Sequence, residues 1–262
     1  MNKKYKLLED YSIQLGDCTL YRIMALRDFA DIECGEIGGF IESEDCLSHD
    51  GDAWVGGNAR VCAGSVVSGN ALVDDNAQVC CNALVYGDSI IIDSAHICDH
   101  AQVFGEALVS DDALVSDHSQ VFDDACVSGN AKVLSHAKVY GHAKVTGYAQ
   151  VCCDTRVYNN ASVYDHAKVC GGVIDDVRAN GQASISGDAE VFDNANVWGN
   201  AQVSGNAKVY GNAEIREAAR VSWNAHVYGR ALVSGEATIF GNARVHGDAI
   251  VFSNAKISGE LS

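Results

Sequence analysis

Along most of the chain, apolar residues recur at every sixth position. Val or Ile occupies 20 such positions from Val55 to Val169 and 13 more from Ile185 to Ile257. Ala stands two residues before almost all of them, which gives the repeat A-x-V-x-G-N, as in Ala201 to Asn206. Residues two apart point to the same side of an extended strand. The pattern therefore predicts many short strands, each with Ala and Val on a buried face and polar residues outside.

The end of each six-residue unit predicts a tight turn. Gly is common there, followed by Asn, Asp, His or Gly, and these residues tolerate a left-handed backbone at low cost. A unit this short can bury its apolar side only by stacking on its neighbours. Three units make a coil of about 18 residues, so the chain predicts about 11 coils. The predicted fold is all-β, a single-stranded parallel β-helix built from hexapeptide repeats.

Residues 1–52 do not repeat and are predicted to form a small capping segment of short strands and turns, with a hairpin region from Tyr5 to Met24. Such a cap would cover the unpaired edge of the first coil, which otherwise recruits other strands. The β-helix is predicted over residues 53–262. Its register slips near 170–184, because Val169 and Ile185 are 16 residues apart and Gly171 to Val177 break the repeat. We interpret the slip as a bulge or a shortened turn.

The opening of the chain contains a distinctive motif. Its parts are Asp28-Phe29, Gly35-Glu36-Ile37-Gly38-Gly39-Phe40-Ile41-Glu42, Leu47-Ser48 and Gly51-Asp52-Ala53-Trp54-Val55. With the repeats that follow, this motif resembles a family of hexapeptide-repeat proteins of bacteria and their prophages, often labelled acyltransferase-like. The resemblance covers the whole chain. It implies a left-handed β-helix and a phage or prophage context, whereas the label rests on the repeat and says little about chemistry.

A coil of constant length places outward-facing side chains in columns. One column is aromatic and begins with Tyr86, Phe104, Phe122 and Tyr140. Stacked rings on neighbouring strands stabilise a sheet by up to about 1 kcal/mol per pair, so this column is either structural or a stacking surface for a ligand or partner. Another column is apolar and contains Leu72, Ile90 and Leu108.

A third column contains Cys62, Cys80, Cys98, Cys152 and Cys170. Its side chains point the same way, whereas metal ligands close around an ion, so no metal site is predicted. Neighbouring thiols could form disulfides if oxidised, but we interpret them as small side chains that fit a strand. Eleven Cys without a secretory leader predict a reducing cytoplasm. No apolar run is long enough to span a membrane.

A corner column holds His100, His118 and His136, and hexapeptide-repeat acyltransferases use a His as general base. These three occupy the turn position that Asn and Asp fill elsewhere, and His is tolerated there. Although Asp99 and Asp117 are adjacent in sequence, no carboxylate is obliged to orient the rings. We therefore predict no catalytic residue and keep the three His as the candidates if the protein is an enzyme.

Charge gives the clearest indication of function. The net charge is −17, and from residue 61 to residue 131 there are eleven acids and no Lys or Arg. Four of these acids are Asp111, Asp112, Asp123 and Asp124. From Lys132 onward the chain has twelve acids and twelve bases. Because apolar residues share the acidic coils, and apolar patches rimmed by one charge usually mark an interface, we predict a binding surface for a basic partner. Direct binding of nucleic acid is excluded by repulsion of the phosphates.

The hexads continue through Ile257 without a polar capping repeat. Because a bare coil edge is a template for pairing, we expect self-association, either a tail-to-tail dimer or a trimer.

Two classes of function remain open. The first is a non-catalytic oligomeric scaffold or binding protein related to phage or prophage, without a cofactor. It would present its acidic face to a host protein with a basic surface or sequester a small ligand. The alternative is an acyl-CoA-dependent acyltransferase, with acetyl-CoA or another acyl-CoA between subunits. A missing active-site loop and a missing basic cluster for the CoA phosphates count against it.

Overall fold

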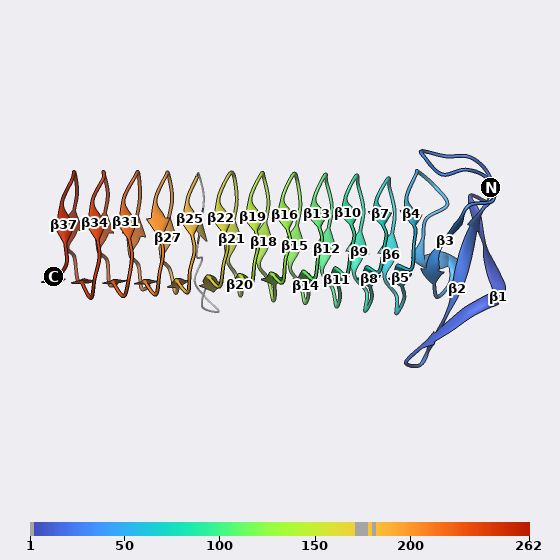
Figure 1. The fold of residues 1–262 in the computed structure, drawn as a ribbon, viewed down its shortest axis with the longest axis horizontal. Coiled ribbons are helices and arrows are strands. Elements are labelled where there is room, and N and C mark those ends of the chain that lie inside the picture. Colours follow the sequence, from blue (N-terminus) through green and yellow to red (C-terminus); the bar gives the residue numbers. More distant parts are fainter. Residues whose placement is uncertain (1–2, 171–177, 180–181) are drawn as a thin grey trace. The chain divides into compact units, whose positions relative to one another are not determined.

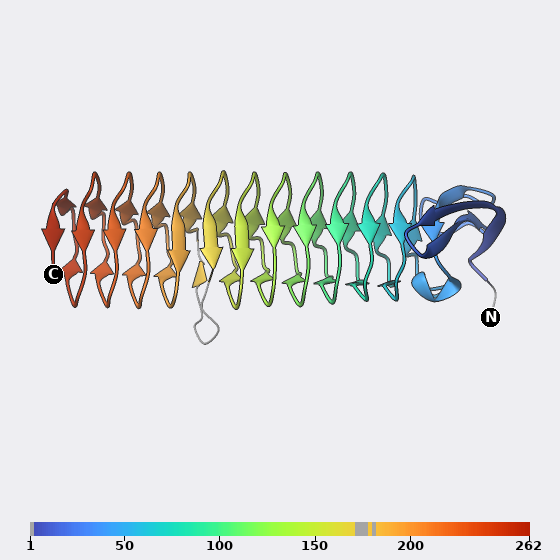
Figure 2. The same ribbon diagram turned by 90° about the horizontal axis from the view of Figure 1, so that it is seen from below.

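The computed structural model describes residues 3–170, 178–179 and 182–262. It is all-β, a parallel β-solenoid of about 12 turns, as the hexads predict. In the described residues the only helical element is a 3₁₀ turn, η1 (Glu44–Cys46). The chain forms two compact units, Met1–Asp124 (unit 1) and Ala125–Ser262 (unit 2). In each unit, short strands follow one another around successive turns (Figure 1, Figure 2).

Unit 1 begins with the cap, whose three strands are β1 (Tyr5–Leu15), β2 (Cys18–Ala25) and β3 (Ile37–Ile41). Two-residue strands follow: β4 (Trp54–Val55), β5 (Arg60–Val61), β6 (Val66–Val67), β7 (Leu72–Val73), β8 (Gln78–Val79), β9 (Leu84–Val85), β10 (Ile90–Ile91), β11 (His96–Ile97), β12 (Gln102–Val103), β13 (Leu108–Val109), β14 (Leu114–Val115) and β15 (Gln120–Val121). They form three sheets in the orders β1-β2-β3-β5-β8-β11-β14, β4-β7-β10-β13 and β6-β9-β12-β15. We call β4-β7-β10-β13 the groove sheet.

The cap is continuous with the first of these sheets. β1 and β2 form the antiparallel hairpin predicted between Tyr5 and Met24, and β2 pairs antiparallel with β3. β3 then pairs parallel with β5, and an isolated bridge joins Leu47 to Val67. Part of the non-repeating segment therefore adds to the solenoid as well as covering it.

The described part of unit 2 contains short strands joined by turns. They are β16 (Cys126–Val127), β17 (Lys132–Val133), β18 (Lys138–Val139), β19 (Lys144–Val145), β20 (Gln150–Cys152), β21 (Arg156–Val157), β22 (Ser162–Val163), β23 (Lys168–Cys170), β24 (Arg178–Ala179), β25 (Ser184–Ile185), β26 (Glu190–Phe192), β27 (Asn196–Val197), β28 (Gln202–Val203), β29 (Lys208–Val209), β30 (Glu214–Ile215), β31 (Arg220–Val221), β32 (His226–Val227), β33 (Leu232–Val233), β34 (Thr238–Ile239), β35 (Arg244–Val245), β36 (Ile250–Val251), β37 (Lys256–Ile257) and β38 (Glu260–Leu261). Every third strand pairs in parallel, which again makes three sheets.

The interior follows the A-x-V pattern in both units. Ala83 and Val85 in unit 1 have no exposed surface, and neither have Ala207 and Val209 in unit 2. The backbone bonds to the next coil, for example from Leu84 N–H to the Ala101 carbonyl at 2.9 Å. The chain contains no Pro, which would lack the N–H group for this ladder. Packing of small Ala and branched Val in the interior is thus what fixes the coil.

At the register slip the coil is lengthened, so the interpretation as a shortened turn is wrong. Lys168 pairs with Glu190 and Ser162 with Ser184, so positions 22 apart lie side by side where 18 is the rule. The coil is longer by four residues. A six-residue pattern cannot distinguish coil lengths that differ by six residues. A coil that is two residues shorter than 18 therefore places Ala and Val at the same positions of the pattern as a coil that is four residues longer. Gly171 to Val177 lie outside the described residues.

The turns adopt the expected left-handed backbone. Asp75, Asp93 and Asp111 have φ values of 57°, 60° and 58°. At Gly87, with φ of 76°, an added Cβ would lie 2.9 Å from the backbone nitrogen of Gly105, so this corner admits no side chain without movement. Trp223 is the unexpected member of this set, because it has φ of 65° and is 69% exposed.

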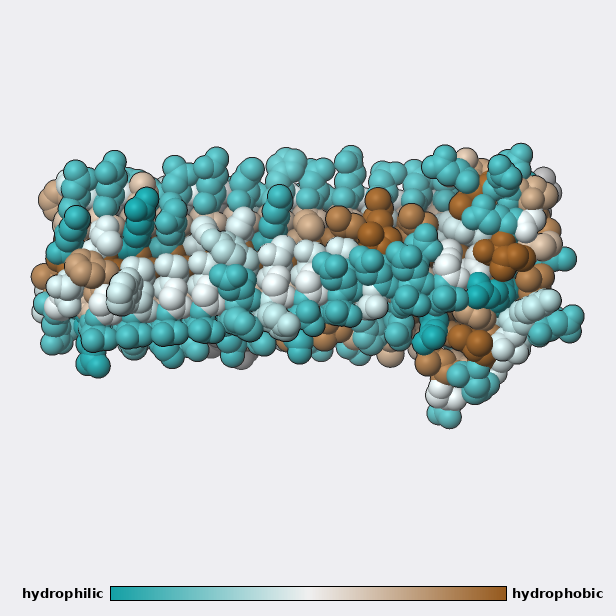
Figure 3. Space-filling view, in the orientation of Figure 1, coloured by the Kyte–Doolittle hydropathy of each residue, from teal (hydrophilic) through white to brown (hydrophobic). Residues whose placement is uncertain are grey.

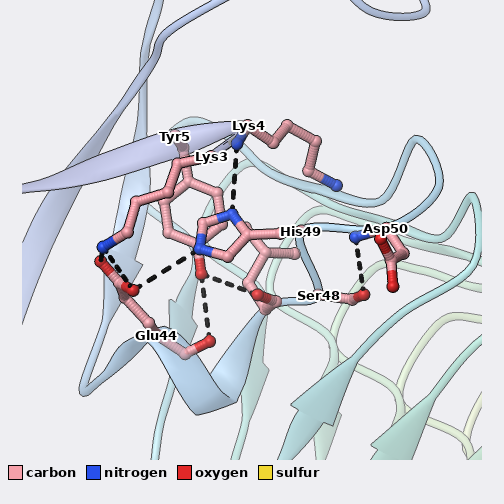
Figure 4. Close-up of polar contacts among 8 residues, drawn as sticks. Lys3, Lys4, Tyr5, Glu44, Ser48, His49 and Asp50 are labelled. Atoms are coloured by element: carbon pink, nitrogen blue, oxygen red, sulfur yellow. Dashed lines mark hydrogen bonds and ion pairs between the residues drawn. The ribbon is translucent and has the colours of Figure 1, made fainter. Parts of the chain in front are cut away.

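A polar cluster joins the start of the chain to residues 44–49 of the cap (Figure 4). The Tyr5 hydroxyl donates to the Leu47 carbonyl at 2.7 Å, and the His49 ring stacks on Tyr5 with centroids 4.4 Å apart. Lys3 donates to Glu44 at 2.6 Å, and this hydrogen bond lowers the pKa of the Glu44 carboxyl. Burial raises the pKa of the Tyr5 hydroxyl, which therefore stays protonated as a donor.

Lys4 is fully buried and donates from Nζ to the Ala53 carbonyl at 2.7 Å and the Gly51 carbonyl at 3.2 Å. Burial lowers the pKa of Lys4 to about 8, and the nearby charge of Asp52 opposes part of that shift. Its ammonium group also lies 5.1 Å from the centre of the Phe29 ring. A buried cation bonded to two carbonyls thus joins the residue before β1 to the loop that leads into β4.

Candidate partner-binding groove

A groove of about 370 Å³ lies in unit 1 between the cap and the groove sheet. It is lined by Ala30, Asp31, Ile32, Asp52, Trp54, Asn70, Leu72, Asp88 and Ile90. The first three belong to the cap loop before β3, and the others come from β4, β7, β10 and the turns before them. The space-filling view shows a hydrophobic patch over β7 and β10 with hydrophilic side chains beside it (Figure 3).

The floor of the groove is apolar. Trp54 pairs in register with Leu72, and Leu72 with Ile90, so the three outward side chains form a strip along the groove sheet. Ile90 is 40% exposed. Trp54 is 3% exposed and meets Phe29 of the cap edge-on, with ring centroids 5.5 Å apart. The strip continues to Leu108 on β13.

Carboxylates rim this floor. Asp52, Asn70 and Asp88 occupy one corner column, in which Asn70 Nδ2 donates to Asp88 at 2.9 Å and Asn70 Oδ1 accepts from the Asp52 N–H at 3.3 Å. Asp31 lines the groove from the cap loop, and all three Asp are exposed. Of the described residues that line the groove, none carries a positive charge.

The predicted acidic residues border the same sheet. Asp111 and Asp112 form the turn after β13, whereas Asp123 and Asp124 form the turn after β15. Asp93 accepts a hydrogen bond from the Asp111 N–H at 3.1 Å, so some turn carboxylates support the next coil. The four predicted Asp are exposed. Acidic corners therefore lie on both sides of the apolar strip.

The aromatic column adjoins one of these corners. Phe104 stacks on Tyr86 and on Phe122 with ring centroids 4.8 and 4.9 Å apart and nearly parallel planes. These residues directly follow strands β9, β12 and β15 and precede Gly87-Asp88, Gly105-Glu106 and the Asp123-Asp124 turn. In unit 2, Tyr140 stacks on Tyr158 at 5.0 Å, and Tyr210 stacks on Phe192 and Tyr228. Stacking is therefore common to both units, which favours a structural role for the rings.

The candidate His side chains lie at another corner. His100 and His118 stack with centroids 5.0 Å apart and are exposed, on the turns between β11 and β12 and between β14 and β15. His136 is exposed on a turn of unit 2. None of the three lines the groove. The acidic rim of the groove would also repel the phosphates of an acyl-CoA.

The Cys column differs between the units. In unit 1, burial raises the pKa of Cys62 to about 11 and that of Cys98 to about 12, and it also raises the pKa of Cys80. Protonated thiols are poor nucleophiles and metal ligands. In unit 2, Cys152 and Cys170 form a disulfide with Cα atoms 4.7 Å apart, so the expectation of unbonded side chains is wrong for this pair. In the described part of the chain no cluster of three or more metal-binding side chains is present.

Sequence reasoning missed Asp31, Asp52, Trp54 and Asp88 as lining residues. The spacing of Asp52, Asn70 and Asp88 could have revealed their shared column, because each is 18 residues from the next. The cap loop that carries Asp31 obeys no period, so its position over the groove sheet follows only from the structure.

No model of a known protein family matches the chain, and no curated protein matches it either. Among the described residues, no helix has the length and apolar character needed to cross a membrane.

Proposed function

We propose that the protein is a non-catalytic binding protein that presents unit 1 to a partner protein with a basic surface. The observation that carries this proposal is the apolar strip Trp54-Leu72-Ile90, which is open to solvent at Ile90 and bordered by carboxylates, with no Lys or Arg among the described residues of the groove lining. Apolar contact supplies affinity, and complementary charge supplies orientation and fast association. The resemblance to prophage proteins supports a host protein as the partner.

A charge-reversal experiment tests this proposal. The variant Asp112→Lys/Asp124→Lys changes two exposed acids of unit 1, and Asp154→Lys/Asp188→Lys makes the same change in net charge in unit 2. Asp111 and Asp123 are left alone because their positive φ values make them sensitive to replacement. The probe is a fluorescent peptide rich in Lys and Arg, followed by anisotropy, with a Glu-rich peptide as its counterpart.

We expect the basic peptide to bind the wild type and to weaken at least about tenfold for the unit 1 variant, with less than about threefold change for the unit 2 variant. Binding should also weaken as salt rises, because exposed charges are screened. Equal losses in both variants, or no binding of the basic peptide to the wild type, would contradict the proposal.

We also propose self-association as a dimer or trimer through the coil that contains β36, β37 and β38. Ile250 and Phe252 are 63% and 64% exposed on this coil, and neighbouring exposed apolar side chains mark contact surfaces. Light scattering should show an oligomer for the wild type and a monomer for Ile250→Lys/Phe252→Lys. A monomeric wild type would exclude it. We also propose a cytoplasmic location, which nine free Cys of eleven support and the single Cys152–Cys170 disulfide opposes.

A further inference from the structure

We infer that the groove beneath the cap loop binds the side chain of a Lys or Arg residue of the partner protein. The inference rests on the proposed function and assigns a particular site to it. The hydrocarbon part of the side chain would lie on Leu72 and Ile90, next to the buried Trp54, and its charged end would reach Asp31, Asp52 and Asp88.

The apolar floor is not required by the fold. Outward residues at the same place of the repeat in unit 2 include Lys144, Ser162 and Gln202, and those strands pair in the same way as β7 and β10. Nothing in the coil therefore demands Ile90, which leaves 40% of its surface exposed. A partly open apolar strip carries a cost in solubility that contact with a partner would remove.

The groove is formed in advance. Backbone hydrogen bonds between Phe29 and Ile32, at 2.8 and 3.1 Å, close the loop that carries Asp31. Phe29 in turn packs edge-on against Trp54, and Asn70 holds Asp88 at 2.9 Å. Little conformational entropy would then be lost on binding, because the walls are already in place.

The chemistry of the lining selects the ligand. Lys and Arg have long apolar stems and cationic ends, which match an apolar floor with carboxylates at its rim. A neutral polar side chain would leave the carboxylates without a cationic partner, and an anionic one would be repelled by them. The floor also continues along the sheet to Leu108, so a peptide chain has further apolar surface on which to lie beyond the groove. This continuity favours a side chain of a protein over a free amine.

The test follows the indole N–H resonance of Trp54 by NMR during titration with blocked tripeptides. Leu-Arg-Leu and Leu-Lys-Leu are the probes, Leu-norleucine-Leu and Leu-Glu-Leu are the neutral and acidic controls, and putrescine represents a free amine. The indoles of Trp198 and Trp223 in unit 2 are internal references in the same spectrum. We expect the two basic peptides alone to shift Trp54, with both references unchanged.

Two variants with the same change in charge sharpen this test. Asp52→Asn/Asp88→Asn should weaken the basic tripeptides at least about tenfold, and Asp112→Asn/Asp124→Asn should change them by less than about threefold. All four positions are exposed, and circular dichroism checks that each variant is folded. Ile90→Asp tests the apolar floor separately from the carboxylates. In this variant, Leu-Lys-Leu should no longer bind more tightly than putrescine.

Equal effects of the two variants, or no response of Trp54 to the basic tripeptides, would overturn the inference. If the longer basic peptide still bound unit 1, the proposed function would survive that result. Tighter binding of putrescine than of either basic tripeptide would also overturn the inference, because the occupant would be a free amine.

Discussion

Units 1 and 2 are built from the same kind of three-strand coil, but they differ in the side chains that face solvent. Strands β7, β10 and β13 carry Leu72, Ile90 and Leu108 outward, whereas β19, β22 and β31 carry Lys144, Ser162 and Arg220. The corners of unit 1 are rich in Asp, and those of unit 2 include the amide ladder Asn206-Asn224-Asn242. The interior is mainly Ala and Val, with some Ile, in both. Folding therefore constrains the side chains inside the coil but not those outside. The apolar and acidic outward side chains of unit 1 need an explanation other than folding.

The largest expected effect concerns the shared interior. Ile91 in unit 1 and Ile215 in unit 2 have no exposed surface. Ile91→Ala and Ile215→Ala should each lower the free energy of unfolding by about 2–5 kcal/mol, because each leaves a cavity between coils. Denaturation followed by circular dichroism measures both. A large loss in one unit with almost none in the other would show that the interiors are not equivalent.

A smaller effect distinguishes the cap-bearing unit. The pKa of Lys4 falls from 10.5 to about 8 in the folded protein, so its protonation opposes folding. Stability from this group is present above pH 10.5 and is lost as pH falls through about 8. The difference corresponds to at most about 3 kcal/mol. In Lys4→Met this dependence disappears, although the hydrogen bonds to Gly51 and Ala53 are lost too.

Urea denaturation at several pH values between 7 and 10.5 checks this prediction. The free energy of unfolding of the wild type, taken relative to Lys4→Met, should increase with pH over that range. Tyr5 has a raised pKa and acts in the opposite direction above about pH 10, but it is present in both proteins and cancels in the difference. A constant difference would show that Lys4 is not buried as a cation.

The smallest effect compares two turn residues. Trp223 has positive φ and accepts strain that Gly would avoid, so Trp223→Gly should stabilise the protein by about 1 kcal/mol. Asp93→Gly in unit 1 should give no such gain, because it also removes the acceptor for the Asp111 N–H. Thermal unfolding measures both variants. Destabilisation by Trp223→Gly would mean that the exposed indole has a folding role.

The sequence was a good guide wherever the period holds. The buried Ala and Val positions, the three-sheet coil and the left-handed turns all follow from the A-x-V-x-G-N pattern. About 11 coils were predicted and about 12 turns are present. The cap contributes to the difference, because Phe40 pairs with Arg60 and Leu47 with Val67 without the repeat motif.

The long coil, the disulfide and the groove could not be predicted from the six-residue repeat alone. The 22-residue coil has the same phase as a coil of 16 residues, so the pairing of Lys168 with Glu190 could not be read from spacing. The disulfide between Cys152 and Cys170 requires oxidation as well as proximity. The groove requires the cap loop to meet the groove sheet, which is a contact between a non-repeating and a repeating segment. Its lining was therefore found only in part.

The constant spacing of paired residues has a consequence for heredity. In unit 2, Lys208 pairs with His226 and His226 with Arg244, each 18 residues along the chain. Removal or duplication of one whole coil in this stretch would leave every remaining Ala and Val facing the interior and every strand with a parallel neighbour. A change of another length must be accommodated outside the strands, as in the coil of 22 residues, because otherwise polar residues would turn inward. Unequal recombination within the gene can therefore lengthen or shorten this part of the protein by whole coils while its interior packing and strand pairing stay the same.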